Sequence, residues 1–186
     1  IILERNEEAM KQIEIAVKLD PVNAFTLTWY GVVLTNAHKY DEAIKAFQDA
    51  LKIEPNYPFA QGNLGSTLVF SGKYKEAIEQ FKFCNAGDTE LVNALEKGYV
   101  EGGLKGALLA YNNVAELRYK NSYWLPNDIA SNYAMAGEKD KAIYWLEQAY
   151  KVRDPNLPYL LYPYWDNLRD DPRFQDLCKR MKLPFK

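Results

Sequence analysis

Small and apolar side chains recur along this chain at the spacing of a helix. Between residues 24 and 37 they stand three, one and three positions apart, which places them on one face of a helix. A second stripe follows Asp41 and ends before Pro55, whose ring cannot continue a helix. Residues 24–57 therefore predict two helices joined by a turn. The stripes consist of Leu27, Tyr30, Gly31 and Leu34, then Ala43, Ile44, Phe47, Ala50 and Leu51.

This pattern repeats along the chain with a period of 34 residues, and such a period is typical of stacked helical repeats. The interval separates Ala9, Ala43 and Ala77. It becomes 30 and then 35 residues between Gly72, Gly102 and Gly137. We divide the chain into a partial repeat at 1–23, full units at 24–57, 58–87, 88–122 and 123–156, and a distinct tail at 157–186.

The small residues predict how closely the two helices of each unit approach. Glycine at position 31 costs about 1 kcal/mol of helix propensity, so we expect a close contact with Ala43 to compensate. The pairs Gly65 with Ala77 and Ala130 with Ala142 repeat this arrangement. Residues 88–122 carry Leu95 at the glycine position, so we expect this helix pair to lie farther apart.

These positions resemble the tetratricopeptide repeat, although Leu27 and Leu34 stand where Trp and Tyr are commoner in that family. The resemblance implies an all-α fold, a right-handed superhelical solenoid of antiparallel helix pairs. The next unit matches at Leu64, Gly65, Leu68, Ala77 and Phe81. In the first full unit the matches by residue class are Leu27, Tyr30, Gly31, Leu34, Ala43, Phe47, Ala50 and Pro55.

Residues 137–184 contain the runs Gly137-Glu138, Asp171-Pro172-Arg173-Phe174 and Leu183-Pro184. In these runs the tail is similar to the end of the C-terminal repeat arrays on many bacterial multidomain regulatory proteins. Asp171 can cap a helix that has Pro172 at its first position. An apolar stripe follows at helical spacing, so we expect a capping helix that covers the open face of the last repeat. The stripe is Phe174, Leu177, Cys178 and Met181.

The beginning of the chain has no such cap. By register, Ile1 falls late in the first helix of a repeat, and the sequence starts without methionine. We interpret the chain as a piece of a longer protein; the alternative is a processed terminus with a lone opening helix. The uncapped end also raises self-association as a hypothesis.

The resemblance further implies a concave groove lined by five positions in the first helix of each unit. Aromatic residues recur at the first of these positions, and exposed aromatic surface marks recognition sites. The alternative for Phe25 and Phe59 is that they seal one repeat against the next. Asparagines here suit a peptide backbone, whereas Thr28 and Val32 replace residues of the family's carboxylate clamp, so chaperone-tail binding is not implied. The candidates are Phe25, Thr28, Trp29, Val32, Asn36, Phe59, Asn63, Ser66, Phe70, Trp124, Asn127, Asp128 and Ser131.

Catalytic chemistry has few candidates in this sequence. The single histidine, His38, is expected in a solvated turn, while Cys84 and Cys178 occupy packing positions. Gly102 and Gly103 lack the Lys–Ser/Thr continuation of a phosphate loop and are interpreted as an interhelical turn. We therefore expect no enzymatic activity, no cofactor and no metal site.

Composition narrows the class of partner. Of 186 residues, 48% are hydrophobic and 26% charged, which excludes a disordered chain. No apolar run approaches the roughly 20 residues of a membrane span. The 23 basic and 25 acidic residues give a net charge of -2, which disfavours nucleic acid. Two cysteines and an opening unlike a signal peptide favour the cytoplasm.

Two functions remain open at this point. The first is a non-enzymatic interaction module that binds a peptide segment, or a neighbouring domain of its parent chain, in the aromatic groove. The alternative is a sensory or regulatory segment of a bacterial signalling or transcription-regulating protein, whose output domain lies outside this chain.

Overall fold

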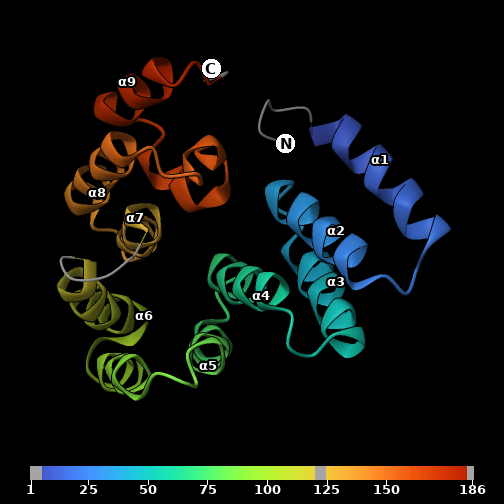
Figure 1. Cartoon of the computed structure of the whole chain (residues 1–186), viewed down its shortest axis with the longest axis horizontal. Coiled ribbons are helices and arrows are strands. Elements are labelled where there is room, and N and C mark those ends of the chain that lie inside the picture. The colour runs from blue at the N-terminus through green and yellow to red at the C-terminus, as the bar shows by residue number, and fades with distance from the viewer. Residues whose placement is uncertain (1–5, 120–124, 184–186) are drawn as a thin grey trace. The chain divides into compact units, whose positions relative to one another are not determined.

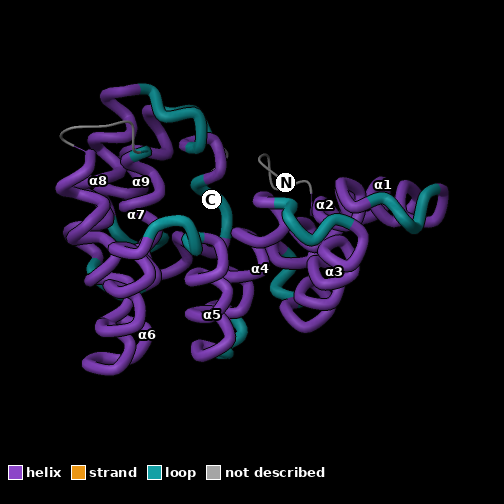
Figure 2. Tube along the Cα trace, turned by 60° about the horizontal axis from the view of Figure 1, so that its bottom comes forward, coloured by secondary structure: helices purple, strands orange, loops and turns teal. Residues whose placement is uncertain are grey.

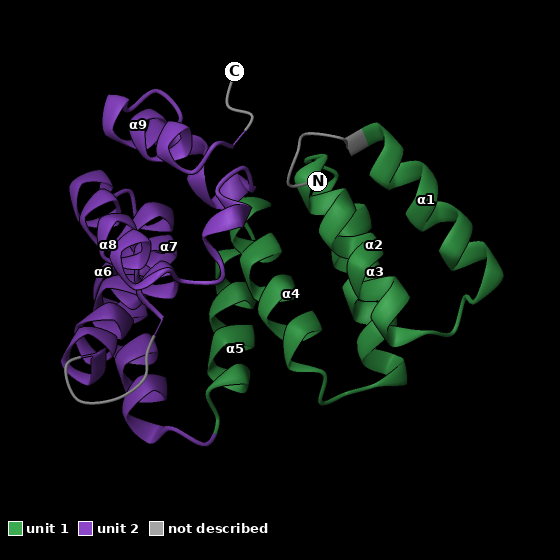
Figure 3. Cartoon of the chain, turned by 45° about the horizontal axis from the view of Figure 1, so that its top comes forward, with its two compact units in different colours: residues 1, 5–86 green, residues 2–4, 87–186 purple. Residues whose placement is uncertain are grey.

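The computed structural model describes residues 6–119 and 125–183, and these ranges consist of helices, turns and short loops without a strand (Figures 1 and 2). They divide into two compact units, one ending at Ala86 and one beginning at Gly87 (Figure 3). The described residues 6–86 are called unit 1, and those from 87 to 183 unit 2. In each unit, helices that follow one another in the chain pack together, which confirms the all-α class built from helix pairs.

Unit 1 contains five helices among its described residues. Helix α2 packs against α1, α3 and α4, so it has neighbours on several sides. Its sequence accordingly has no charged residue, whereas α3, with solvent on one side, alternates buried apolar and exposed polar positions. The helices are α1 (Asn6–Leu19), α2 (Ala24–Asn36), α3 (Tyr40–Ile53), α4 (Pro58–Phe70) and α5 (Tyr74–Cys84).

The turns of three helix pairs, α2–α3, α4–α5 and α7–α8, share one backbone conformation. Residues His38, Gly72 and Gly137 all have positive φ, at 58°, 78° and 79°. The next residue in each turn donates its N–H to a carbonyl five positions back, which closes the helix end. His38 therefore occupies a position that glycine fills elsewhere. It lies in an exposed turn as predicted, and its Nδ1 is 2.6 Å from the Tyr40 hydroxyl.

The glycines of unit 1 do provide close helix contacts, but with different partners from those expected. A Cβ atom added at Gly31 would lie 2.6 Å from Cε1 of Phe47, and one at Gly65 would lie 2.5 Å from Cε1 of Phe81. The expected partners Ala43 and Ala77 are not the nearest neighbours of these two positions. The aromatic ring one helical turn farther along the partner helix occupies the space instead.

Unit 2 begins with α6 (Thr89–Tyr119), which is bent at Gly102 and Gly103 (Figure 1). Gly103 has φ 59° and ψ -150°, a conformation that side chains disfavour, so this is the predicted interhelical turn. The expectation of a wide separation between its halves is wrong near the turn. A Cβ at Gly98 would lie 2.4 Å from the Gly106 carbonyl oxygen, because two glycines bring the backbones together there.

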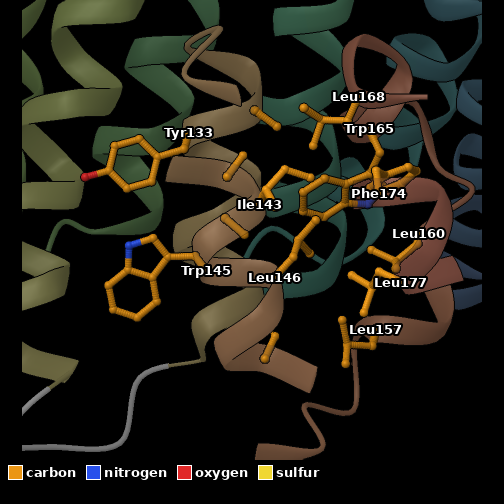
Figure 4. Close-up of a cluster of buried hydrophobic side chains, with 14 of the residues drawn as sticks. Tyr133, Ile143, Trp145, Leu146, Leu157, Leu160, Trp165, Leu168, Phe174 and Leu177 are labelled. Carbon is orange, nitrogen blue, oxygen red and sulfur yellow. The ribbon is translucent and has the colours of Figure 1, made fainter. Parts of the chain in front are cut away.

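The remaining elements of unit 2 are α7 (Pro126–Met135), α8 (Lys139–Val152), the 3-10 helices η1 (Leu157–Tyr159) and η2 (Pro163–Leu168), and α9 (Pro172–Arg180). Asp171 caps α9 as predicted, accepting a hydrogen bond from the Arg173 N–H at 2.9 Å. The stripe residues Phe174 and Leu177 are buried in one cluster with side chains of α8 (Figure 4). The tail therefore covers the last helix pair.

The tail keeps the register of the repeats. Asn167 of η2 donates to the Ala134 carbonyl of α7 at 2.7 Å, and Arg173 of α9 pairs with Asp140 of α8 at 2.8 Å. Both contacts join residues 33 positions apart, close to one repeat length. The cap is thus a shortened repeat, in which the 3-10 helices replace the first helix and α9 replaces the second.

The packing of Gly31 leads to a stability prediction. We expect Gly31→Ala to lower the free energy of unfolding by about 1–3 kcal/mol, because the new methyl group overlaps the fully buried ring of Phe47. Gly62→Ala on α4 is the matched control, since a Cβ there meets nothing within 4 Å. It should instead raise stability by about 1 kcal/mol through helix propensity. Urea unfolding followed by circular dichroism checks both, and a Gly31→Ala protein as stable as the parent would contradict the packing argument.

Candidate functional site

Four aromatic side chains of unit 1 form a continuous series, which we call the aromatic patch: Phe25, Trp29, Tyr57 and Phe59. The ring centroids of Phe25 and Trp29 are 6.3 Å apart, those of Trp29 and Phe59 5.3 Å, and those of Phe59 and Tyr57 6.3 Å. Phe25 is 60% exposed and Phe59 39% exposed. The rings therefore contact one another and still present apolar surface to solvent.

Local sequence explains why these rings meet. Asn23 caps α2 by accepting a hydrogen bond from the Thr26 N–H at 3.0 Å, and Pro58 occupies the first position of α4. Each helix thus starts one residue before a phenylalanine, and Phe25 and Phe59 are equivalent by repeat. Because α2 and α4 are in contact, the equivalent rings come to the same edge of the unit.

Two polar contacts hold the neighbouring repeats of unit 1 in register. The hydroxyls of Thr35 and Thr67 share a buried hydrogen bond of 3.0 Å between α2 and α4. The Lys73 ammonium at the start of α5 lies 2.7 Å from an Asp41 carboxylate oxygen at the start of α3. Both pairs join residues 32 positions apart, two fewer than the 34-residue period, so they fix the offset between the two neighbouring repeats.

Three of the predicted groove residues in unit 1 have almost no accessible surface. Thr28 is 0%, Val32 2% and Ser66 7% exposed. The Thr28 hydroxyl donates to the Ala24 carbonyl at 2.7 Å, and the Ser66 hydroxyl to the Gly62 carbonyl at 3.2 Å. Because the neighbouring helices enclose these positions, we remove these three residues from the candidate contact surface.

The other predicted residues of unit 1 remain partly accessible. Asn36 and Asn63 each donate one amide proton to the carbonyl four residues earlier in their own helix, at 2.8 and 2.7 Å. Only the second proton and the oxygen of each amide are left for a peptide backbone. Phe70 packs on Tyr40 with a centroid distance of 6.0 Å, at the opposite end of α4 from Phe59.

In unit 2 the predicted residues lie in the first turns of α7, apart from Trp124, which lies outside the described residues. The Asn127 backbone N–H donates to Asp154 at 3.0 Å, and the Ser131 hydroxyl donates to the Asp128 carbonyl at 2.8 Å. Asn127 Oδ1 is buried and accepts no hydrogen bond from a described residue. These side chains therefore organise the beginning of α7.

Two acidic residues, Asp154 and Asp128, lie close together at the beginning of α7. Asp154 is buried and accepts hydrogen bonds from the backbone N–H groups of Asn127 and Asn156, at 3.0 and 2.9 Å. Although Asp128 as a residue is exposed, desolvation of its carboxyl and the nearby Asp154 charge raise its pKa to about 6. The ionised form of Asp128 is thus disfavoured in the folded state.

The cysteines differ from each other in their surroundings. Cys178 is buried as predicted, and desolvation raises its pKa to about 11. Cys84, expected in a packing position, is exposed at the end of α5, where Gln80 Nε2 donates to its sulfur at 3.7 Å. Partial desolvation raises the pKa of this thiol too, so neither sulfur has the lowered pKa of a reactive cysteine.

Among residues 6–119 and 125–183, no three His, Cys, Asp or Glu side chains are grouped so that they could hold a metal ion. In the same ranges, no helix combines the length and the apolar character that crossing a membrane requires.

Part of unit 1 is similar to a known protein family. Residues 34–82, from the end of α2 into α5, match the family model of the tetratricopeptide repeat. This segment is similar to tetratricopeptide repeats. No curated protein matches it. Tetratricopeptide repeats generally mediate protein–protein interaction, which agrees with the general function expected from the sequence.

Within these repeats, Tyr57 is a candidate that the repeat positions missed. It precedes the first residue of α4 and so falls outside the five groove positions. Its ring nevertheless extends the aromatic patch through Phe59. The signal available in the sequence was the Tyr57-Pro58-Phe59 run, in which proline marks the helix start between two aromatic residues.

The acidic pair in unit 2 leads to a pH prediction. Between about pH 4 and pH 6 the folded protein binds a proton on Asp128 that the unfolded chain, with the ordinary pKa of 3.8, has lost. The contribution of Asp128 to stability therefore falls as pH rises through this range and stays unfavourable above it. We expect Asp128→Asn to be more stable than the parent at pH 7, with the difference disappearing near pH 3.5.

Urea unfolding at a series of pH values measures this effect. Asp170→Asn, at an exposed aspartate of the same unit, is the matched control for replacing an aspartate by asparagine. A stability difference for Asp128→Asn that does not change between pH 3.5 and 7 would rule out the proton linkage.

Proposed function

We propose that this chain is a non-catalytic interaction module whose unit 1 binds a peptide segment on the aromatic patch. The segment belongs either to a separate protein or to a neighbouring domain of the parent chain. The observation that carries the proposal is the exposed series of Phe25, Trp29, Phe59 and Tyr57 at one edge of repeats that match a protein-binding family.

Aromatic side chains favour this role for energetic reasons. Each ring has a large apolar area and few rotatable bonds, so binding it costs little conformational entropy. Trp and Tyr are also the residues most often found to dominate the energy of protein interfaces. Phe25 keeps more than half of its surface in water although its neighbours are rings, so an apolar partner would gain by covering it.

The helices that carry the aromatic patch, α2 and α4, have no charged residue, which favours an apolar contact with the partner. Neither α2 nor α4 contains a Lys, Arg, Asp or Glu residue. These helices therefore offer no cation for a peptide carboxylate and no anion for a basic segment. The recognition we propose depends on apolar contact supplemented by hydrogen bonds.

Substitution of the two rings on α2 tests the proposal. Peptides selected from a random phage-displayed library against the 186-residue chain should bind Phe25→Ala and Trp29→Ala at least about tenfold more weakly than the parent, since each change removes a partly buried ring. Isothermal titration calorimetry measures the affinities, and circular dichroism checks that the helices are retained.

Phe83→Ala is the matched control for this experiment. Phe83 is an exposed phenylalanine of the same unit, 56% accessible, on α5 and outside the aromatic patch. Its removal should leave the affinity unchanged. Equal affinities for the parent, Phe25→Ala and Trp29→Ala would refute the assignment of the patch.

A further inference from the structure

The aromatic patch contains two hydrogen-bond donors that the chain itself does not use. The Trp29 indole N–H and the Tyr57 hydroxyl make ring contacts only, with no hydrogen-bond partner among the described residues. Both residues are half-buried, yet neither polar atom is enclosed. A ligand that covers the patch must satisfy these donors or leave them desolvated, which costs roughly 1–3 kcal/mol for each.

The ligand must therefore supply acceptors beside apolar surface. Neither α2 nor α4 carries a charged side chain that could pair with a charged group of the ligand, so neutral carbonyls suit these donors best. A bound α-helix has already used its carbonyls internally, except at its end. An extended strand offers N–H groups as well as carbonyls and needs a sheet edge to pair with, which helices do not provide.

A polyproline II segment satisfies these conditions together. It has no internal hydrogen bonds, so its carbonyls are available, and its prolines have no N–H group that needs an acceptor. Its proline rings are compact apolar surfaces that pack on aromatic side chains. Because it is stiff before binding, it also loses little conformational entropy on docking.

The size of the patch agrees with this ligand. Successive ring centroids are 6.3, 5.3 and 6.3 Å apart. Polyproline II rises about 3.1 Å per residue, so a segment of about six residues is enough to cover all four rings.

We infer that the aromatic patch of unit 1 binds a proline-rich segment in the polyproline II conformation, with Trp29 Nε1 and Tyr57 Oη donating hydrogen bonds to its backbone carbonyls. The inference rests on the proposed function and specifies the chemistry of the ligand. In this inference the four rings pack on the apolar surface of the ligand, and Trp29 Nε1 and Tyr57 Oη donate hydrogen bonds to its uncharged backbone.

Fluorescence anisotropy of a labelled decaproline peptide, titrated with the 186-residue chain, tests the inference. We expect decaproline to bind at least about tenfold more tightly than a Gly-Ser decapeptide, which has the same length but no preference for polyproline II. Trp29→Phe and Tyr57→Phe, which keep a ring and remove one donor, should each weaken binding about threefold to tenfold. Tyr74→Phe, at an exposed tyrosine on α5 outside the patch, is the matched control and should bind as the parent does.

Each alternative outcome is informative. Decaproline binding no tighter than the Gly-Ser peptide, or unchanged affinity in both donor-deleting variants, overturns the inference. Tighter binding of an amphipathic Leu/Lys helical peptide at the patch overturns it too. If decaproline fails while library-selected peptides still depend on Phe25 and Trp29, the ligand chemistry is wrong and the proposed function stands; if neither peptide class depends on the patch, both fail.

Discussion

Close packing between the two helices of each pair is the contact on which the rest of this structure depends. At Gly31 the absence of a side chain admits the buried ring of Phe47, and at Gly65 it admits Phe81. In α6 the same effect is reached between two backbones, where Gly98 and Gly106 face each other. Each glycine lowers helix propensity, but the packing it permits fixes the distance between two helices. Because the pairs are closely packed, stacking them places equivalent residues of successive repeats side by side.

Contacts at about one repeat length then carry the register along each unit. In unit 1 they are the Thr35–Thr67 hydrogen bond and the Asp41–Lys73 ion pair. In unit 2 they continue into the tail through Asp140 and Arg173, which is why residues 157–183 behave as a shortened repeat. The Asp41–Lys73 and Asp140–Arg173 ion pairs are exposed and contribute little to stability. Their main role here is to favour one offset between neighbouring repeats.

The aromatic patch is a consequence of this register. Phe25 and Phe59 take the same position in two repeats, Trp29 follows one turn after Phe25, and the rings meet because α2 and α4 are neighbours. The supporting helices are uncharged for a structural reason, since each packs against three other helices of unit 1. That constraint of folding also sets the chemistry of the surface, which presents rings and two unused donors rather than charges.

The sequence by itself determined the helix pairs, the positions of their turns and the N-terminal cap of α9. These features depend on local periodicity and on residues such as Pro58, Asp171 and Gly103, whose effects extend over only a few positions. Only the tertiary structure decided which groove positions are accessible. Thr28, Val32 and Ser66 share a face with Trp29 in the repeat pattern, yet their burial depends on helices that are distant in sequence. Sequence spacing likewise could not decide which residue of α3 packs against Gly31, because Ala43 and Phe47 lie on the same face of that helix. Only the distances in the folded structure show that the Phe47 ring occupies the space beside Gly31.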